Sequence, residues 1–559
     1  MQRHGAHKAQ MFMLTALLSL CTTSTTLAGE LAVFSTSDVH GSIMGWDYFQ
    51  AQPTDVGLAK IYTLLQEKRR SLSKNDASLL IDVGDNLQGT PLDTYLAEHE
   101  HAWKRGEHPV FQAFRVMGYD AIVLGNHEFT FGLPYLRKAS AQLQGELLAA
   151  NVIDNKTGKV WDGVRPYVIK KLKVDGRELK VGIIGTVTPA IPNLEAPAHY
   201  AGVHFVDQIP VMQHYIKELQ TKGVDILIAA VHSGAQRTEQ DADENQALAI
   251  AKACPELSLL ICAHNHVVID NATGLHASDG IFYKNAIVHG VPIIETGKDG
   301  KYLGESLLRL NYVQGEWRVE QVTTEAIPVK GVTDDSKIDA LAKPWHEKTL
   351  QELSQKIGEA TGDFLGAESN HQDSALIDFI NNVQREAAGT ELSATAALNT
   401  SQDLKKGPIT LQQIAGLYVY ENYLYGIEIT GAQLRKYLEH AADFYGTSPD
   451  YNYDMVQGVQ YTIDLRQPKG HRLTRLIYHG KDVKDSDTFT LAINDYRFHG
   501  GSGYMQAMGF DETHPPKIVY DSLKTLGEAG QVRNLIIVYL QKKKSITPIV
   551  DNHWEVIGR

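Results

Sequence analysis

Short apolar runs alternate with amphipathic stretches between residue 30 and about residue 310. The runs are rich in Val, Ile and Leu without strict alternation, which is typical of strands buried on both faces. In order they are LAVFSTS, ASLLIDVG, DAIVLG, ELLAANV, LKVGIIGTV, VDILIAAVHS and LSLLICAH. Segments between them, such as VGLAKIYTLLQEKRR and PVMQHYIKELQTKG, have helical spacing. The alternation predicts a layered α/β domain over residues 29–335.

The pattern changes after this domain. KIDALAKPWHEKTLQELSQKIGEATGDF is charged and helical in spacing, with Pro344 expected near its first turn, and predicts a linker helix over residues 336–365. Beyond it, helical ALIDFINNVQREAAG and TGAQLRKYLEHAADF lie among tyrosine-rich segments that resemble strands. Residues 366–559 are therefore expected to form a separate α+β domain.

The first 28 residues have the layout of a secretory signal peptide. Arg3 and Lys8 precede the apolar stretch Met11 to Leu20, and small residues follow near Ala28. A membrane anchor is the alternative, but about ten apolar residues are too few to span a bilayer, which needs about 20. We therefore expect export to the periplasm or the extracellular space, with no stable membrane insertion.

Composition narrows the class of partner. The chain has 559 residues, 43% of them hydrophobic, and a formal net charge of −13, so two or three globular domains are expected and a nucleic-acid polymer is disfavoured. Once Cys21 leaves with the signal peptide, Cys254 and Cys262 remain, either as one disulfide or as two buried thiols. No pattern in the chain specifies an oligomeric state.

Polar side chains occur at the ends of five predicted strands, where open α/β sheets place their ligand sites. These residues are Asp38, His40, Asp85, Asn86, Asn126, His127, His232, His264 and His266. Taken singly, each His reads as a hydrogen-bonded loop residue, and each Asp or Asn as a turn former or helix cap. Together they offer carboxylate, amide and imidazole ligands suited to two divalent ions (Mn²⁺, Zn²⁺, Fe or Co²⁺) that act on a phosphoryl group.

Other catalytic signatures are missing from the sequence. The chain has no GxxxxGK[ST] phosphate loop, no HExxH zinc helix and no GxSxG nucleophile elbow. GIIGTVT lacks the spacing of a dinucleotide loop and is expected to be a buried strand.

The motif order DVHG, GDNLQG, GNHE, HSG and AHNH resembles that of the calcineurin-like metallophosphoesterases. LYVYENYLYGIEITGAQLRKYLE and AINDYRFHGGSGY resemble the C-terminal domain of the 5′-nucleotidase family. Within that family, SIMGWDYFQAQPTDVGLAKI and NLQGTPL are most similar to bacterial 2′,3′-cyclic-nucleotide 2′-phosphodiesterase/3′-nucleotidases. 5′-Nucleotidases usually have a proline–phenylalanine pair where this chain has Val419 and Tyr420. The resemblance implies a β-sandwich metallophosphoesterase domain flanked by helices, joined to a nucleotide-binding domain.

The resemblance also implies site residues. One metal ion would be held by Asp38, His40, Asp85 and His266, and a second by the shared Asp85 with Asn126, His232 and His264. His127 would stabilise the transition state beside the substrate phosphate, with Asn126 also near that phosphate. Family 5′-nucleotidases orient this His with an Asp three residues later, where this chain has Thr130. Cyclic-nucleotide members commonly carry a neutral residue there.

In the second domain, the resemblance implies that Tyr420 and Tyr496 sandwich the nucleotide base. By spacing alone, Tyr418, Tyr420, Tyr423 and Tyr425 read as a half-exposed strand face. Asn422 and Arg497 are candidates for polar contacts, and Gly500, Gly501 and Gly503 for close backbone approach to the ribose. Ser502 replaces an Asp that often binds the ribose in 5′-nucleotidases.

The expected function is hydrolysis of 2′,3′-cyclic nucleotides to 3′-nucleotides and then to nucleoside and phosphate. The expected partner is therefore a small-molecule nucleotide. One alternative is a 5′-nucleotidase or a broader nucleotide and UDP-sugar hydrolase with the same metals. A non-enzymatic alternative is a surface nucleotide-binding protein that retains the fold.

Overall fold

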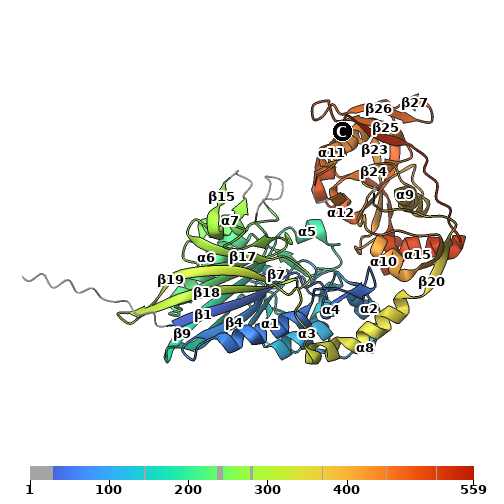
Figure 1. The fold of residues 1–559 in the computed structure, drawn as a ribbon. Coiled ribbons are helices and arrows are strands. Elements are labelled where there is room, and N and C mark those ends of the chain that lie inside the picture. Colours follow the sequence, from blue (N-terminus) through green and yellow to red (C-terminus); the bar gives the residue numbers. More distant parts are fainter. Residues whose placement is uncertain are drawn as a thin grey trace, which may run out of the picture.

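The computed structural model describes residues 29–143, 147–235, 243–276, 281–367, 369–447, 450–511 and 513–559. Two bodies lie side by side, the first running from blue to yellow-green and the second from orange to red (Figure 1). Helix α8 (Ser336–Leu353) runs along the first body toward the second. The expected signal peptide, residues 1–28, lies outside the described residues.

The first body is built on two large sheets. One has the strand order β19-β18-β1-β4-β5-β6, in which β1, β4, β5 and β6 are parallel and β18 and β19 are antiparallel. Its strands are β1 (Gly29–Thr36), β4 (Ala77–Asp82), β5 (Ala121–Val123), β6 (Leu147–Leu148), β18 (Tyr302–Val313) and β19 (Glu316–Pro328). The other has the order β13-β17-β12-β11-β9-β8, with β16 paired to β17. It comprises β8 (Tyr167–Val174), β9 (Arg177–Val187), β11 (Ile226–His232), β12 (Leu259–Cys262), β13 (Val268–Ile269), β16 (Ile287–Val288) and β17 (Val291–Thr296).

The two sheets pack face to face. Val33, Ile81 and Val123 of the first sheet share a core with Ile183 and Ile228 of the second. The opposite face of the first sheet packs against α1 (Leu58–Ser71), α3 (Pro109–Met117) and α8, and the second sheet packs against α6 (Gln208–Thr221) and α7 (Ala247–Ala253). Because both faces of each sheet are covered, the strands are continuous apolar runs. The expected β-sandwich flanked by helices is confirmed.

Smaller elements complete this body. They are β2 (Trp46–Asp47), β3 (Gln52–Pro53), α2 (Pro91–Glu98), η1 (Glu100–Ala102), α4 (Gly132–Ala139), β7 (Val152–Asp154), α5 (Ile191–Leu194), β10 (Val203–Phe205), β14 (Leu275–His276), β15 (Phe282–Tyr283) and η3 (Lys284–Ala286).

Helix α8 occupies part of the segment expected to be a linker. It packs on α1, α2 and α3, and Ile338 and Ala342 join their core. Pro344 lies in the interior of the helix rather than in its first turn. The helix ends at Leu353, and β20 (Lys356–Ala360) follows and pairs with β22 (Gly407–Thr410). The domain limits at residues 335 and 366 stay predictions.

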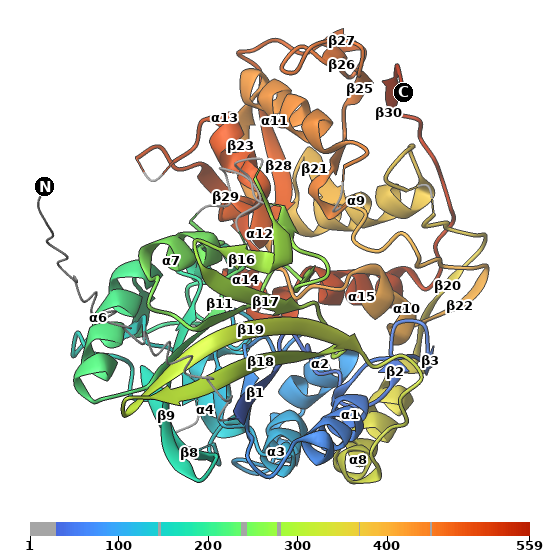
Figure 2. The same cartoon turned by 60° about the vertical axis from the view of Figure 1, so that its left-hand side comes forward.

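The second body is built around a five-stranded sheet of order β24-β21-β28-β23-β29 and a four-stranded sheet of order β27-β26-β25-β30 (Figure 2). The strands are β21 (Leu392–Ala396), β23 (Leu424–Thr430), β24 (Asp454–Gln457), β25 (Gln460–Asp464), β26 (Leu473–Tyr478), β27 (Lys481–Asp482), β28 (Thr488–Asn494), β29 (Lys517–Asp521) and β30 (Trp554–Ile557). The helices are α9 (Ala375–Ala388), α10 (Leu411–Leu417), α11 (Gly431–Phe444), η4 (Asp450–Asn452), α12 (Asp495–Phe498), η5 (Gly501–Gly503), α13 (Tyr504–Met508), α14 (Ser522–Leu526), η6 (Gly527–Gly530) and α15 (Val532–Lys543).

Two alternatives left open by the sequence are decided here. Cys254 and Cys262 are both buried and free, so the disulfide does not form. Tyr418 and Tyr420 lie in the loop between α10 and β23, Tyr423 directly precedes β23 and Tyr425 lies in it, so the four tyrosines do not form one strand face. No helix in the described part of the chain is long and apolar enough to cross a membrane.

Candidate active site

The polar strand ends of the first body meet where the two sheets face each other. Asp38 and His40 follow β1, and Asp85 follows β4. Asn126 and His127 follow β5, His232 ends β11, and His264 and His266 follow β12. Parallel strands place their carboxyl ends at one edge, so residues more than 200 positions apart become neighbours.

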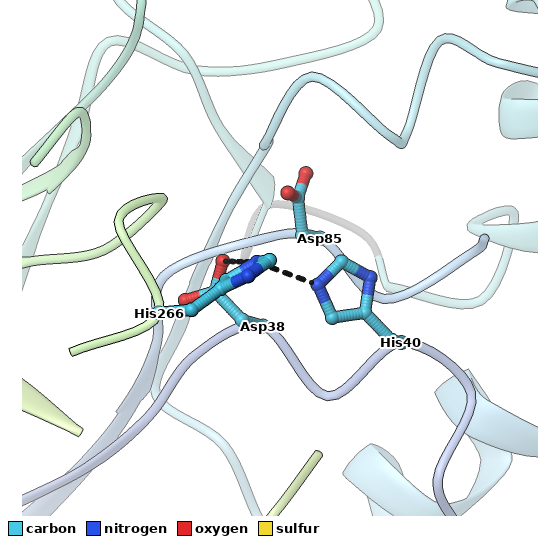
Figure 3. Close-up of side chains that lie close together, drawn as sticks. All are labelled: Asp38, His40, Asp85 and His266. Carbon is cyan, nitrogen blue, oxygen red and sulfur yellow. Dashed lines mark hydrogen bonds and ion pairs between the residues drawn. The ribbon is translucent and has the colours of Figure 1, made fainter. Parts of the chain in front are cut away.

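Asp38, His40, Asp85 and His266 form the first ligand group (Figure 3). Nε2 of His40 and Nε2 of His266 lie 3.0 Å apart, and His266 Nε2 lies 3.5 Å from Asp38 Oδ1. Nδ1 of His40 donates to the Gln88 carbonyl at 2.7 Å, which leaves Nε2 directed at the group. Burial and the neighbouring His266 lower the pKa of His40 to about 4, so its imidazole is neutral and suited to ligation.

Asp85, His232 and His264 form the second group, so Asp85 belongs to both. Nε2 of His232 lies 3.1 Å from Asp85 Oδ2 and 3.2 Å from Asn126 Oδ1, while its Nδ1 donates to the Val83 carbonyl at 2.6 Å. All the ligands that the family pattern implies are thus brought together.

The chemistry of these donors fits divalent metal ions. Carboxylate and amide oxygens converge on imidazole nitrogens whose other ring nitrogen is already occupied, so positive charge is needed between them. Burial alone would lower the pKa of His232, but the charge of Asp85 outweighs it and raises the pKa to about 10. A metal ion supplies that positive charge, and the mixed oxygen and nitrogen set suits Mn²⁺, Zn²⁺, Fe or Co²⁺.

The backbone at these ligands is strained. The φ angles are 49° at Asp38, 48° at His40, 60° at Asp85, 86° at His264 and 60° at His266. Non-glycine residues seldom adopt this left-handed region, and such residues cluster at functional sites because the surrounding structure must hold them there. Five of the seven implied ligands share this backbone conformation, whereas Asn126 and His232 do not.

Glu128 joins two of the ligand loops. Its carboxylate accepts the backbone N–H groups of Asp85 at 2.8 Å, Asn86 at 2.6 Å and Gly125 at 2.5 Å. A Cβ on Gly125 would lie 2.2 Å from Asp85 Oδ1, so only glycine permits this approach. Glu128 is thus a structural residue of the centre.

His127 is connected to a carboxylate that the sequence did not reveal. Its backbone N–H donates to Asp85 Oδ1 at 2.8 Å, and its Nδ1 lies 3.2 Å from Thr130 Oγ1. Thr130 donates to Glu195 Oε1 at 2.6 Å, and Glu195 Oε1 lies 3.8 Å from His127 Nδ1. His199 Nδ1 is bonded to the other Glu195 oxygen at 3.0 Å. The Glu195 carboxylate therefore lies on the Nδ1 side of His127, although residue 130 is neutral.

Glu244 is a second residue that the motifs did not single out. Its Oε1 lies 2.6 Å from His264 Nε2. A carboxylate can only accept there, so Nε2 is the donor and Nδ1 keeps the lone pair for a metal ion. Such outer carboxylates orient metal-binding histidines.

Two aromatic side chains expected to bind the base lie in the second body. Tyr420 and Tyr496 are half-buried, whereas Tyr418, Tyr423 and Tyr425 are buried in packing. Tyr451, not singled out from the sequence, packs edge-on against Tyr420 with ring centroids 6.4 Å apart.

Arg497 packs against the Tyr496 ring and is hydrogen-bonded to the Tyr451 backbone. Its guanidinium is bonded to both carboxylate oxygens of Asp454 at 3.0 Å, to the Tyr451 carbonyl at 2.6 Å and to Ser502 Oγ at 3.0 Å. It is buried and lies over the Tyr496 ring. Most of its N–H donors are engaged by these neighbours, and direct contact of Arg497 with substrate stays a prediction.

The glycine turn packs against the Tyr496 ring. A Cβ on Gly501 would lie 2.6 Å from the Tyr496 ring carbons, so this glycine makes room for the aromatic ring, while the close approach of the turn to a ribose stays a prediction. Gly500 and Gly503 have φ angles of 107° and 75°, which form the turn. Asn422 hydrogen-bonds Asp495. Burial raises the pKa of Asp495 to about 7, and the bond from Asn422 offsets part of this rise.

Glu421 connects the two bodies. Its carboxylate accepts from Thr94 Oγ1 at 2.8 Å and from the Gln88 amide, and it pairs with Arg533 at 2.8 Å. Gln88 and Thr94 belong to the first body, and Gln88 also holds His40 through its carbonyl. The loop that carries Tyr420 is thereby connected to a metal-ligand candidate.

Comparison with known proteins agrees with this geometry. Residues 32–268 match the family model of the calcineurin-like phosphoesterases, and residues 356–509 match that of the 5′-nucleotidase C-terminal domain. The 2′,3′-cyclic-nucleotide 2′-phosphodiesterase/3′-nucleotidase of Yersinia enterocolitica is 28% identical over 97% of this chain and 91% of its own length. The protein of the same name from Salmonella typhimurium is 29% identical over 98% of this chain and 92% of its own length.

A solved structure has the same architecture over both bodies. The crystal structure of a Staphylococcus aureus protein provisionally described as a 5′-nucleotidase aligns with a TM-score of 0.77 and 25% identity, covering 94% of this chain and 99% of that one. The chain belongs to the calcineurin-like metallophosphoesterases that carry a 5′-nucleotidase C-terminal domain, and is a metal-dependent phosphoric ester hydrolase.

Proposed function

We propose that this protein is an exported two-metal phosphoesterase that opens 2′,3′-cyclic nucleotides to 3′-nucleotides and then releases nucleoside and phosphate. The observation that carries the proposal is the pair of ligand groups that share Asp85. Two neighbouring divalent ions are the arrangement used for in-line displacement at phosphorus.

In this proposal Asp38, His40, Asp85 and His266 hold one ion, and Asp85, Asn126, His232 and His264 hold the other. When bound, the two ions supply Lewis acidity that activates a water and offsets charge on the phosphoryl oxygens. The water oxygen bonds to phosphorus and gives up one proton as the bond from phosphorus to the ribose 2′ oxygen breaks, and the 2′ oxygen takes up one proton to become a hydroxyl.

His127 is the residue proposed to act on the phosphoryl group in the transition state and to assist the leaving oxygen. Two observations support this assignment. Its side chain is 23% exposed, and its ring centroid lies 5.5 Å from that of His40, beside the first ligand group. Thr130 and Glu195 hold its Nδ1 side, which leaves Nε2 for the substrate.

The choice of a cyclic substrate rests on three features. The relatives from Yersinia enterocolitica and Salmonella typhimurium carry that name. Thr130 is neutral where 5′-nucleotidases have Asp. Ser502 has no carboxylate to accept from the ribose hydroxyls. Its own hydroxyl donates to Asn452 Oδ1 at 2.5 Å and accepts from Arg497. A cyclic phosphate blocks both hydroxyls and does not need that acceptor.

A 5′-nucleotidase is the second candidate, because the solved Staphylococcus aureus structure is described as one and shares both bodies. The decisive experiment compares kcat/KM of the purified protein for 2′,3′-cAMP, 3′-AMP, 5′-AMP and a UDP-sugar with Mn²⁺, Zn²⁺ and Co²⁺. We expect the first two substrates to be fastest. Faster turnover of 5′-AMP would reject the cyclic assignment.

Two further parts of the proposal have their own tests. A surface nucleotide-binding protein would retain its function after Asp85→Ala, whereas the enzyme would lose hydrolysis. Export is tested by sequencing the amino terminus of the mature protein from the periplasm or medium, where we expect cleavage near Ala28. A full-length cytosolic product would reject export.

A further inference from the structure

A second group of metal-ligating side chains lies in the second body, far along the chain from the phosphoesterase motifs. Asp373 precedes α9 and Asp378 lies in its first turn, while Asp551 and His553 lie just before β30. One ligand atom from each of the four lies within 4.8 Å of the others. Figure 2 shows the dark-red C-terminal segment running up the edge of this body to β30.

These side chains converge on Nδ1 of His553. Nδ1 lies 3.2 Å from Asp373 Oδ2 and 3.6 Å from Asp378 Oδ1, and it also contacts Asp551 Oδ1. Nε2 of His553 donates to the Val456 carbonyl at 2.9 Å. The imidazole is therefore fixed with Nδ1 directed at three carboxylates.

The group holds more negative charge and more acceptors than its neighbours satisfy. The side chains of Asp373 and Asp378 are 5% and 4% exposed, and Oδ1 of each is buried without a hydrogen-bond partner. Among the described residues, no Lys or Arg forms an ion pair with any of the three carboxylates. Buried carboxylates in this position are strongly destabilising unless they are paired or bind a metal.

We propose that Asp373, Asp378, Asp551 and His553 bind a structural divalent transition-metal ion that fastens the C-terminal segment to the start of α9. Three carboxylate oxygens and one imidazole nitrogen are a ligand set for Zn²⁺ or Mn²⁺, whereas Ca²⁺ and Mg²⁺ take oxygen ligands almost alone. Asp551, whose side chain is 45% exposed, provides the path by which the ion enters.

The alternative is a cation-free cluster held by protons. Burial and the charges of Asp373 and Asp551 raise the pKa of Asp378 to about 7. Burial alone would lower the pKa of His553, but bonds to Asp373 and Asp551 outweigh it and raise the pKa to about 10. The two possibilities differ in how the protein responds to loss of one carboxylate charge.

The test compares the wild-type chain with Asp378→Asn, in which the amide oxygen can still accept the Asp551 N–H. Both proteins are loaded with Mn²⁺, and separately with Zn²⁺, then desalted and analysed by elemental mass spectrometry. We expect Asp378→Asn to retain one equivalent fewer per chain, with kcat/KM on its nucleotide substrate unchanged within about twofold because the active-site ligands are intact. Equal metal content would overturn the proposal.

Thermal unfolding gives a second readout. With Mn²⁺ or Zn²⁺ the wild type should have the higher Tm, and in excess chelator the order should reverse, because the variant removes a buried charge that the ion no longer offsets. A higher wild-type Tm under both conditions would indicate hydrogen bonding alone and reject the ion. Asp511→Asn, which alters an exposed Asp–His pair of the same body, is the matched control and should change neither readout.

If Asp378→Asn does not fold, Asp551→Asn provides the same metal count from a half-exposed position. That variant should also lose one equivalent and keep its activity. Retention of the full metal content in a folded Asp551→Asn protein would likewise reject the site.

Discussion

Thr130 Oγ1 donates a hydrogen bond to Glu195 Oε1 at 2.6 Å, while the same Oγ1 lies 3.2 Å from His127 Nδ1. Thr130 thus links the His127 imidazole to the carboxylate of Glu195, which lies 65 positions after Thr130 in the chain. The carboxylate that family 5′-nucleotidases carry three residues after the histidine is supplied here by the segment that follows α5 (Ile191–Leu194).

From this relationship we predict that Glu195→Gln lowers kcat by about 10- to 100-fold, because general acid–base assistance contributes about 10²- to 10⁴-fold and Gln keeps part of the hydrogen bonding, with little change in KM. The loss should be larger for nucleotides than for p-nitrophenyl phosphate, whose leaving oxygen needs no proton. Thr130→Asp in the Glu195→Gln background should restore part of kcat. Equal losses on both substrates without rescue would show that Glu195 only stabilises the fold.

Asp85 is shared by both ligand groups, so its loss should affect both ions. We predict that Asp85→Asn lowers kcat/KM by about 10³-fold or more, since Lewis-acid stabilisation of several kcal/mol is removed. Bound metal, measured by elemental analysis, should fall in parallel. Asp162→Asn, at an exposed position, is the control and should behave as wild type.

Tyr420 and Tyr496 should contribute only to binding of the nucleoside part of the substrate. Tyr420→Ala and Tyr496→Ala should each remove about 1–3 kcal/mol of stacking, or about 5- to 150-fold in kcat/KM for nucleotides. Hydrolysis of p-nitrophenyl phosphate, which has no base, should change little. Tyr312→Ala, an exposed tyrosine of the first body, is the control. Equal losses on both substrates would contradict the stacking role.

Gly125 tests how closely the ligand loops must approach. Gly125→Ala places a methyl group 2.2 Å from Asp85 Oδ1, which displaces either the carboxylate or the loop. We expect lower metal content and lower kcat. Gly158→Ala, where the structure has open space but a left-handed backbone, controls for general loss of stability. Normal metal content in Gly125→Ala would contradict the crowding argument.

The metal-free protein should lose stability as pH rises, through Asp378. Its folded pKa of about 7 lies above the ordinary 3.8, so its contribution is fully present below pH 3.8 and lost as pH passes through 7. Groups facing it are Asp373, Asp551, His553 and Tyr461. In chelator, the Tm advantage of Asp378→Asn over wild type should therefore be larger at pH 8 than at pH 5. No pH dependence of that difference would contradict the assignment.

Much of the first body could be predicted from the sequence, because the patterns that indicate its strands are local. Each predicted strand, including DAIVLG and VDILIAAVHS, is a continuous apolar run, and each of the implied ligands lies within a few residues of a strand end. Glu195 and Glu244 could not be found this way, since they lie in loops without periodicity and their partners come from other strands. A motif also reveals residue type but not neighbours, so the sequence did not show that the buried Asp454 holds the Arg497 guanidinium.

The loop of residues 418–422 carries Tyr420 next to Glu421, and Glu421 is bonded to Gln88, whose carbonyl holds His40. The proposed base-stacking residue Tyr420 and the proposed metal ligand His40 are therefore separated by only a few bonded neighbours. A mutation that reshapes this loop to admit a new base is expected to disturb His40 as well. We therefore expect changes in this loop to alter substrate range and turnover together, and new specificities to arise more readily through Tyr496, which lies outside the loop of residues 418–422.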